Sequence, residues 1–206
     1  MKLLLNFAYW LISFVASITL FPSILYKGLF RDKSYMEYLG FYSDKSARLN
    51  EKSIWVHCSS VGEVQIGIRL LKELKELAPE KRYVLTVVTR TGRDVAKYLA
   101  SEDIEVRHFP LDLKSTQKRG YKYFNPEKLV LIETELWPNC LRVAVKRNVD
   151  LYLANGRISD RSYATYLRIG SIFEMLLKRF RLFMMQSKAD MERIAVSYTH
   201  LRAHET

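Results

Sequence analysis

Short apolar runs that alternate with helix-like segments constrain the fold of this chain most strongly. The runs lie at 53–59, 83–89, 104–110, 128–134, 150–156 and 181–187. Helical patterns lie between them at 62–78, 92–101, 136–147 and 159–179, with a weaker one at 113–123. Strands that are apolar nearly throughout and separated by helices are typical of a parallel sheet covered on both faces. We therefore predict an α/β fold, a Rossmann-like doubly wound domain over residues 51–195.

An uncharged segment precedes this domain. Residues 3–26 contain no Asp, Glu, Lys or Arg, and this length is enough to cross a bilayer core of about 30 Å at about 1.5 Å per residue. Lys27, Arg31 and Lys33 follow it, which predicts that the domain lies on the cytoplasmic side. We predict a single-pass transmembrane anchor over residues 1–27 and a basic connection over 28–50. A signal peptide cleaved near Ala16 and a buried core helix are the alternatives.

The charge balance favours anionic partners. Lys and Arg number 33 against 22 Asp and Glu, so the net charge is +11. Nucleic acid, phosphorylated small molecules and an acidic membrane surface all fit this charge, but no nucleic-acid-binding motif is present. The only two cysteines, Cys58 and Cys140, fall in predicted core segments. One pair makes no disulfide framework, which favours a reducing compartment.

The residues that follow the predicted strands are the candidates for a binding site. In a doubly wound sheet, ligands bind beyond the carboxyl ends of the strands, where helix amino termini attract anions. These positions are small or polar here. The candidates are Ser60, Gly62 and Glu63 after the first strand, Thr91 and Gly92 after the second, Glu133 and Glu135 after the fourth, and Asn155 and Arg157 after the fifth.

Glu63 is the candidate with the clearest chemistry. At about 100° per residue it falls on the apolar side of its helix, with Gly67 and Leu71. One interpretation is a carboxylate that only stabilises the helix start through the exposed N–H groups. The other is a general base that accepts a proton from a substrate hydroxyl within about 3 Å.

The other charged candidates also have two interpretations each. Glu133 and Glu135 stand two apart at a predicted strand end, which predicts that they project to the same side. They would perturb each other's protonation or bind sugar hydroxyls, or else pair with an arginine and a helix start. Arg157 would bind a phosphate or carboxylate, or be solvated. The S-x-x-D pattern of Ser187 and Asp190 predicts a helix cap and needs no further role.

Several chemistries lack their sequence motifs. The chain has no G-x-G-x-x-G, no G-x-x-x-x-G-K-[ST] and no G-x-S-x-G. His57 and His108 lie on predicted strands without spaced Cys or His partners, so no metal site is predicted. The absence of a D-x-D pair argues against a glycosyltransferase that holds its nucleotide through a divalent ion.

Several ordered motifs together resemble one family. They are "EYLGFY", "HCSSVGEV", "TRTG", "FPLDL", "LVLIETELWPN", "NGRIS" and "QSKAD", in this order behind the apolar amino terminus. They resemble the 3-deoxy-D-manno-octulosonic acid (Kdo) transferase family over residues 1 to about 195. Cys58, Arg90, Gly156 and Lys188 depart from residues that are frequent in the family.

The resemblance implies a membrane-anchored glycosyltransferase with two Rossmann domains (GT-B type) at the cytoplasmic face of the bacterial inner membrane. It would transfer Kdo from CMP-Kdo to the lipid A precursor, lipid IVA, with inversion and without a metal or other cofactor. Glu63 corresponds to the catalytic base. Glu133, Glu135, Trp137, Asn155 and Arg157 match motif positions near the cleft.

The end of the chain departs from the family. Members carry a second domain that holds most of the sugar-nucleotide site, so we expect this chain to be the acceptor-side part and inactive alone. Residues 196–206 do not resemble the family and are predicted to be a non-native tail. The alternative function is a membrane-tethered module that binds an anionic lipid without chemistry.

Overall fold

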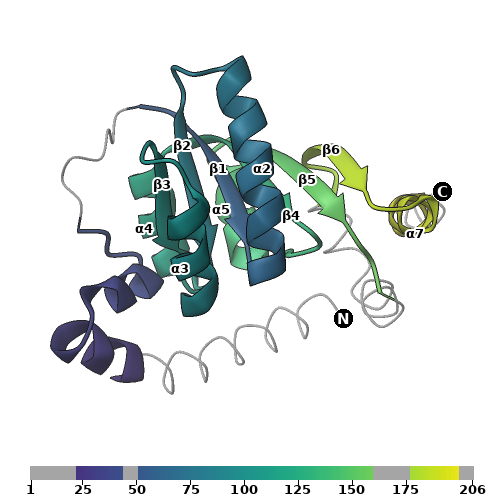
Figure 1. Cartoon of the computed structure of the whole chain (residues 1–206). Coiled ribbons are helices and arrows are strands. Elements are labelled where there is room, and N and C mark those ends of the chain that lie inside the picture. The colour runs from purple at the N-terminus through teal and green to yellow at the C-terminus, as the bar shows by residue number, and fades with distance from the viewer. Residues whose placement is uncertain (1–21, 44–50, 160–176, 200–206) are drawn as a thin grey trace, which may run out of the picture.

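The computed structural model describes residues 22–43, 51–159 and 177–199, and shows one sheet with helices on both faces (Figure 1). The sheet has six strands, all parallel, in the order β3-β2-β1-β4-β5-β6. The strands are β1 (Ser53–Cys58), β2 (Arg82–Val87), β3 (Ile104–His108), β4 (Pro126–Ile132), β5 (Asp150–Gly156) and β6 (Phe180–Met185). The six predicted strands and the Rossmann-like order are confirmed.

The helices also agree with the sequence pattern. They are α2 (Val61–Leu77), α3 (Arg90–Leu99), α4 (Lys114–Phe124), α5 (Pro138–Lys146) and α7 (Lys188–Thr199). The weaker prediction at 113–123 is confirmed by α4. The predicted helix at 159–179 lies almost wholly outside the described residues. α7 continues to Thr199, into the segment predicted to be a non-native tail, whose origin stays a prediction.

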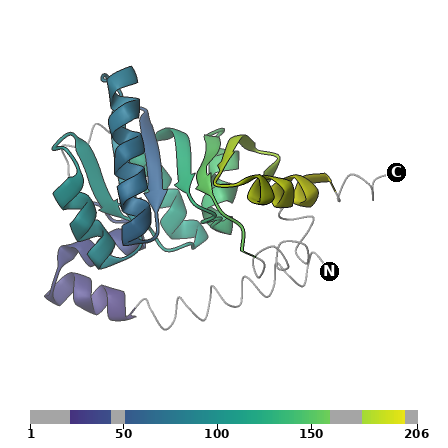
Figure 2. The ribbon, with the colours of Figure 1, turned by 45° about the vertical axis from the view of Figure 1, so that its right-hand side comes forward.

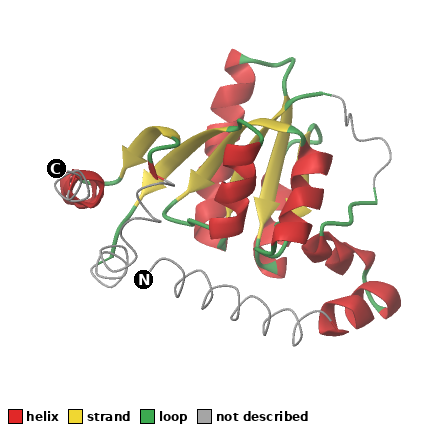
Figure 3. Cartoon of the chain, turned by 180° about the vertical axis from the view of Figure 1, so that it is seen from behind, coloured by secondary structure: helices red, strands yellow, loops and turns green. Residues whose placement is uncertain are grey.

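Two apolar layers hold the helices on the sheet. α2 and α3 cover the face seen in Figure 1, and α4 and α5 cover the face seen from behind in Figure 3. Because neighbouring residues on a strand point to opposite faces, Val56 packs with α2 on one side while Trp55 packs with Tyr121 and Phe124 of α4 on the other. Both predicted core cysteines are buried and free.

The strand order reverses between β1 and β4. β1 is followed by β2 and β3 on one side, while β4, β5 and β6 lie on the other. The chain leaves β1 and β4 in neighbouring positions at the carboxyl edge of the sheet. This edge is therefore the place where a doubly wound sheet binds ligands.

The predicted basic connection contains helical structure. Residues 22–30 are helical, and Lys33–Leu39 form the 3-10 helix η1, drawn in purple in Figures 1 and 2. η1 ends at Gly40, whose φ of 78° suits a glycine. Within the described ranges, no helix has the length and apolar character needed to cross a bilayer. The predicted anchor over residues 1–27 lies mostly outside those ranges and stays a prediction.

Candidate functional site

Glu63 lies at the first turn of α2, where the chain leaves β1. Ser60 is the N-cap residue, and its Oγ accepts a 3.3 Å hydrogen bond from Glu63 N. The Glu63 carboxylate reaches back, and its Oε2 accepts a 2.7 Å hydrogen bond from Ser59 N. The side chain is only 4% exposed, which confirms its predicted place on the apolar side of the helix. The structure also shows the helix-start contact of the first interpretation, because this pairing resembles a capping box.

The surroundings of Glu63 oppose its negative charge. Burial is the largest cause that raises the pKa of Glu63 above its ordinary value, and the charges of Glu135 and Glu133 raise it further. The hydrogen bonds from Ser59 and Ser60 act in the opposite direction without reversing the shift. A buried carboxyl group with a raised pKa beside two other acids is suited to exchanging a proton with a hydroxyl.

A second cap of the same pattern shows that burial and the neighbouring acids, not the capping pattern, raise the pKa of Glu63. In α7, Asp190 N donates to Ser187 Oγ at 3.1 Å, and Ser187 Oγ donates back to Asp190 Oδ2 at 2.5 Å. The pKa of Asp190 is lowered, first by the hydrogen bond from Ser187 and next by that from Ile158 N, with help from Arg193 and Arg157. A capping carboxylate is thus ordinarily stabilised in its charged form. Glu63 is the exception because it is buried beside two other acids.

Glu133 and Glu135 approach Glu63 from β4, but not as the strand pattern predicts. β4 ends at Ile132, and Glu133 has a φ of 57°, in the left-handed region. Side chains alternate between the two faces only along extended backbone. The prediction that both glutamates project to one side from a strand end is therefore wrong, because they lie beyond the strand and Glu133 is not extended. Both residues are half-buried. Their charges still reach Glu63, so these three acids form one electrostatic cluster at the switch point.

The end of β5 and the loop that follows it lie against the Glu133 turn. Glu133 N donates to Ala154 O at 2.9 Å, and Thr134 Oγ1 is paired with the backbone of Arg157. Asn155 is half-buried with a φ of 56°, and the Arg157 side chain is exposed. These contacts bring Asn155 and Arg157 to the same edge as the acids. Thr134 is a contact that the sequence pattern did not single out.

Asp190 also fixes this loop, which its capping pattern did not indicate. Its Oδ1 accepts a 2.8 Å hydrogen bond from Ile158 N, and Arg193 donates to Ile158 O at 2.5 Å. Asp190 is 8% exposed. The first turn of α7 therefore holds the residue next to Arg157, so the prediction that the cap needs no further role is wrong.

Thr91 and Gly92 lie at the start of α3, on the other side of the β1 turn. Thr89 is the N-cap residue, and Gly92 N donates to its Oγ1 at 3.1 Å. A Cβ on Gly92 would lie 2.7 Å from Val87 Cγ1 and 3.8 Å from the carbonyl carbon of Ser60. The close approach requires glycine and brings the α3 start against the turn that carries Ser60. Thr91 and Ser60 are exposed there, as is Gly62 in the first turn of α2.

The FPLDL motif supports the start of α5. Asp112 Oδ2 accepts from Asn139 N at 3.0 Å, and Asp112 Oδ1 accepts from Cys140 N at 2.8 Å. A carboxylate from another loop thus satisfies the free N–H groups of α5. This helix start is consequently occupied by the protein itself.

The described histidines and acids do not form a metal site. His57 is buried, with Nδ1 3.0 Å from Thr86 Oγ1 and its ring stacked on Phe109 at 3.8 Å. Burial lowers the pKa of His57 to about 3, so the ring is neutral at ordinary pH. In residues 22–43, 51–159 and 177–199, no group of three or more His, Cys, Asp or Glu side chains is arranged to hold a metal ion.

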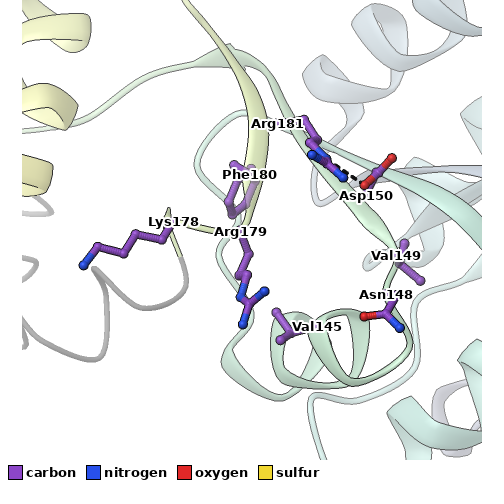
Figure 4. Close-up of a pocket in the computed structure, with 8 residues that line it drawn as sticks. All are labelled: Val145, Asn148, Val149, Asp150, Lys178, Arg179, Phe180 and Arg181. Carbon is purple, nitrogen blue, oxygen red and sulfur yellow. Dashed lines mark hydrogen bonds and ion pairs between the residues drawn. The ribbon is translucent and has the colours of Figure 1, made fainter.

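A cavity of about 250 Å³ lies at the opposite edge of the sheet, where β5 and β6 begin. Figure 4 shows Arg181 turned to Asp150, at 2.8 Å, while Lys178 points away from the other lining residues. The cavity lies beside the carboxyl end of α5, whose dipole disfavours anions. No predicted site residue lines it.

The fold and the acids at its switch point define the class: a Rossmann-like α/β protein with carboxylates at the carboxyl edge of a parallel sheet. A family model described as 3-deoxy-D-manno-octulosonic-acid transferase (kdotransferase) matches residues 33–203. The chain belongs to this Kdo transferase family.

Curated relatives agree with this assignment. A bifunctional glycosyltransferase/methyltransferase of Fusobacterium nucleatum is 39% identical over 153 residues, covering 73% of this chain and 24% of the relative. A 3-deoxy-D-manno-octulosonic acid transferase of Haemophilus influenzae is 30% identical, covering 77% of this chain and 37% of the relative. One of Aquifex aeolicus is 29% identical, with 74% and 39% covered. The chain thus spans well under half the length of each.

Proposed function

We propose that this chain is the acceptor-side part of a glycosyltransferase that moves Kdo from CMP-Kdo to the lipid A precursor. The observation that carries the proposal is Glu63, a buried carboxyl group with a raised pKa at the switch point of the sheet. The family membership supports the same chemistry, and the relatives from Haemophilus influenzae and Aquifex aeolicus are Kdo transferases.

In the proposed reaction Glu63 acts as the general base. A sugar hydroxyl of the acceptor gives its proton to Oε1 of Glu63 as its oxygen bonds to the anomeric carbon of Kdo. The bond from that carbon to the phosphate oxygen of CMP breaks on the opposite face, and CMP leaves with the electron pair. The configuration is inverted, and no metal takes part in the proposed step. Ser59 N holds Oε2, so the base has a fixed orientation.

The remaining candidates surround Glu63 at this edge. Ser60, Gly62, Thr91 and Gly92 flank it on the β2 side, and Glu133, Glu135, Asn155 and Arg157 flank it on the β5 side. The exposed Arg157 suits a phosphate or carboxylate of a substrate. Glu133 and Glu135 add to the rise in the pKa of Glu63 that burial causes first, and a carboxylate with a raised pKa is a stronger proton acceptor.

The amino-terminal segment supports an anionic membrane surface as a partner. Tyr26, Leu29 and Phe30 are 58%, 63% and 73% exposed, next to Lys27 and Arg31. Exposed aromatic and aliphatic side chains beside basic ones suit the interface of an anionic bilayer. A position on the cytoplasmic face of the bacterial inner membrane would confine the enzyme with its lipid acceptor.

The test is Glu63→Gln in the full-length transferase that contains this chain. Glutamine keeps the Ser59 hydrogen bond but accepts no proton, so we expect turnover to fall about 100-fold or more while the fold is retained. Glu73→Gln is the matched control, because Glu73 lies on the exposed side of the same helix. Transfer at a near-normal rate by Glu63→Gln would refute the role of Glu63.

The second candidate function is a membrane-tethered module that binds an anionic lipid without chemistry. It is favoured by the exposed side chains of Tyr26, Leu29 and Phe30 beside the basic Lys27 and Arg31. Binding of lipid A precursor vesicles by the 206 residues, with no product from CMP-Kdo, would support it. Turnover by these residues alone would exclude it.

A further inference from the structure

The segment Asp32–Tyr42 lies across the carboxyl ends of β2 and β3 and is fixed there by a buried acid. Glu37 is 4% exposed. Its Oε2 accepts a 2.7 Å hydrogen bond from His108 N at the end of β3, and its Oε1 lies 3.3 Å from Arg93 Nη2 of α3. Arg107 Nη1 lies 3.5 Å from the same oxygen. A carboxylate bound this way ties η1 to two elements that are distant in sequence.

Tyr38 adds a contact to the loop that follows β2. Its hydroxyl donates to Val88 O at 2.8 Å, and its ring stacks on His108 at 4.3 Å. Its own carbonyl accepts from Leu111 N at 2.8 Å. Tyr38 therefore binds the chain one residue before Thr89, which caps α3.

Three contacts of this segment surround the β2–α3 loop, a name used here for Val88–Thr89 together with the first turn of α3, Arg90–Arg93. Tyr38 holds Val88 at its beginning and Glu37 holds Arg93 at its end, while Asp32 lies 4.0 Å from Arg90. This loop carries Thr91 and Gly92, and Gly92 packs against the turn that leads to Glu63. In Figures 1 and 2 the purple segment lies beneath this end of the sheet.

We propose that Asp32–Tyr42 is a positioning element for the site, with Glu37 as its central positioning residue. It holds the β2–α3 loop against the β1 turn, so that Thr91 and Gly92 meet the acceptor in one fixed arrangement. The role of the loop in acceptor binding rests on the proposed function. Arg93 is only 7% exposed, so removing the charge of Glu37 leaves a buried cation without its counter-charge and displaces the start of α3.

Hydrogen–deuterium exchange of this chain tests the positioning directly. In Glu37→Gln we expect the amides of Val88–Arg93 to exchange about tenfold faster or more, because a hydrogen bond to a charged group is lost. Tyr38→Phe removes one hydroxyl and gives a smaller increase at the same amides. If Glu37→Gln does not fold, the exchange rates of Tyr38→Phe alone test the proposal. Glu37→Asp keeps the charge and restores part of the protection.

Glu127→Gln is the matched control. Glu127 is half-buried and pairs with Lys81 at 3.0 Å, and it lies at the beginning of β4, away from the Glu37 contacts. We expect the loop amides of this variant to keep wild-type exchange. Unchanged exchange in Glu37→Gln and Tyr38→Phe, or an equal increase in Glu127→Gln, would overturn the proposal.

Binding to vesicles that contain the bisphosphorylated lipid A precursor links the positioning to function. We expect Glu37→Gln to weaken binding several-fold, Glu37→Asp to recover part of it, and Glu127→Gln to bind as the wild type. Faster loop exchange with unaltered binding would overturn the role in the site. If the wild type does not bind these vesicles, the proposed function fails, and the exchange rates alone decide the positioning.

Discussion

Ser59 N donates a 2.7 Å hydrogen bond to Oε2 of Glu63, although burial raises the pKa of the acceptor. The same carboxyl group therefore closes the start of α2 and lies in surroundings that oppose its charge. The capping carboxylate of α7, Asp190, is by contrast stabilised as an anion. The cost of holding Glu63 ionised therefore distinguishes it from Asp190 and supports a role in proton transfer.

Glu63→Gln is expected to be more stable than the wild type at neutral pH. Below the ordinary pKa of 4.5, Glu63 is protonated in both the folded and unfolded chain, so the variant has no advantage. Above 4.5 the unfolded chain releases the proton while the folded chain still holds it, so the wild type loses free energy of unfolding. Urea unfolding at pH 4.5 and 7.5 measures the difference. Lower stability of the variant at pH 7.5 would mean that the Ser59 hydrogen bond outweighs burial.

Gly92→Ala is expected to lower the free energy of unfolding by about 1–3 kcal/mol through overpacking. The added Cβ would lie 2.7 Å from Val87 Cγ1 and 2.8 Å from Thr89 Oγ1, the atom that caps α3. Gly62→Ala is the control, since its Cβ meets only Ser60 Oγ at 3.9 Å. Its stability should stay within about 0.5 kcal/mol of the wild type. Equal effects of the two changes in urea unfolding would contradict the packing described at α3.

Asp190→Ala is expected to cost more than Ser187→Ala, although both remove the cap of α7. Losing the Ser187 cap costs about 1 kcal/mol. Losing Asp190 also frees Ile158 N, so the total should reach about 2–4 kcal/mol. Because hydrogen bonds lower the pKa of Asp190 below 3.8, the gap between the wild type and Asp190→Ala should narrow as the pH falls through that lowered value. Urea unfolding from pH 7 to 3 tests both points, and identical losses would refute the second role of Asp190.

Much of the fold could be predicted because its signals are local. Each buried strand is a short apolar run, and each run predicted an observed strand within two residues of its ends. Glu63 was also predictable, because helical periodicity alone places it on the side of Gly67 and Leu71. The raised pKa of Glu63 was not predictable, since part of it is caused by Glu133 and Glu135, which follow β4 and lie far from Glu63 in the sequence.

The parts that could not be predicted depend on long-range contacts. Glu37 looks like an ordinary glutamate in a basic segment, yet its partners Arg93 and His108 follow 56 and 71 residues later. Glu133 has the left-handed conformation without a glycine or asparagine to signal it, so strand alternation failed there. A single sequence contains no local pattern for either feature.

His57→Phe is expected to reduce the loss of stability on mild acidification. Burial lowers the pKa of His57 to about 3 and, as the largest cause, that of His108 to about 4, from an ordinary 6.5. Below pH 6.5 the unfolded chain binds protons at these residues and the folded chain does not. As the pH falls from the ordinary pKa to the lowered one, each histidine therefore decreases the free energy of unfolding by up to about 1.4 kcal/mol per pH unit.

Phenylalanine does not titrate and keeps an aromatic ring against Phe109, so His57→Phe should remove one of these two contributions while His108 keeps the other. Thr86 loses a partner but still accepts from Trp55 Nε1 at 2.8 Å, so some stability at pH 7.5 should be lost as well. The measurement is the slope of the unfolding free energy from pH 6.5 to 5, above the range in which ordinary carboxyl groups titrate. A slope equal to that of the wild type would show that His57 binds a proton in the folded chain.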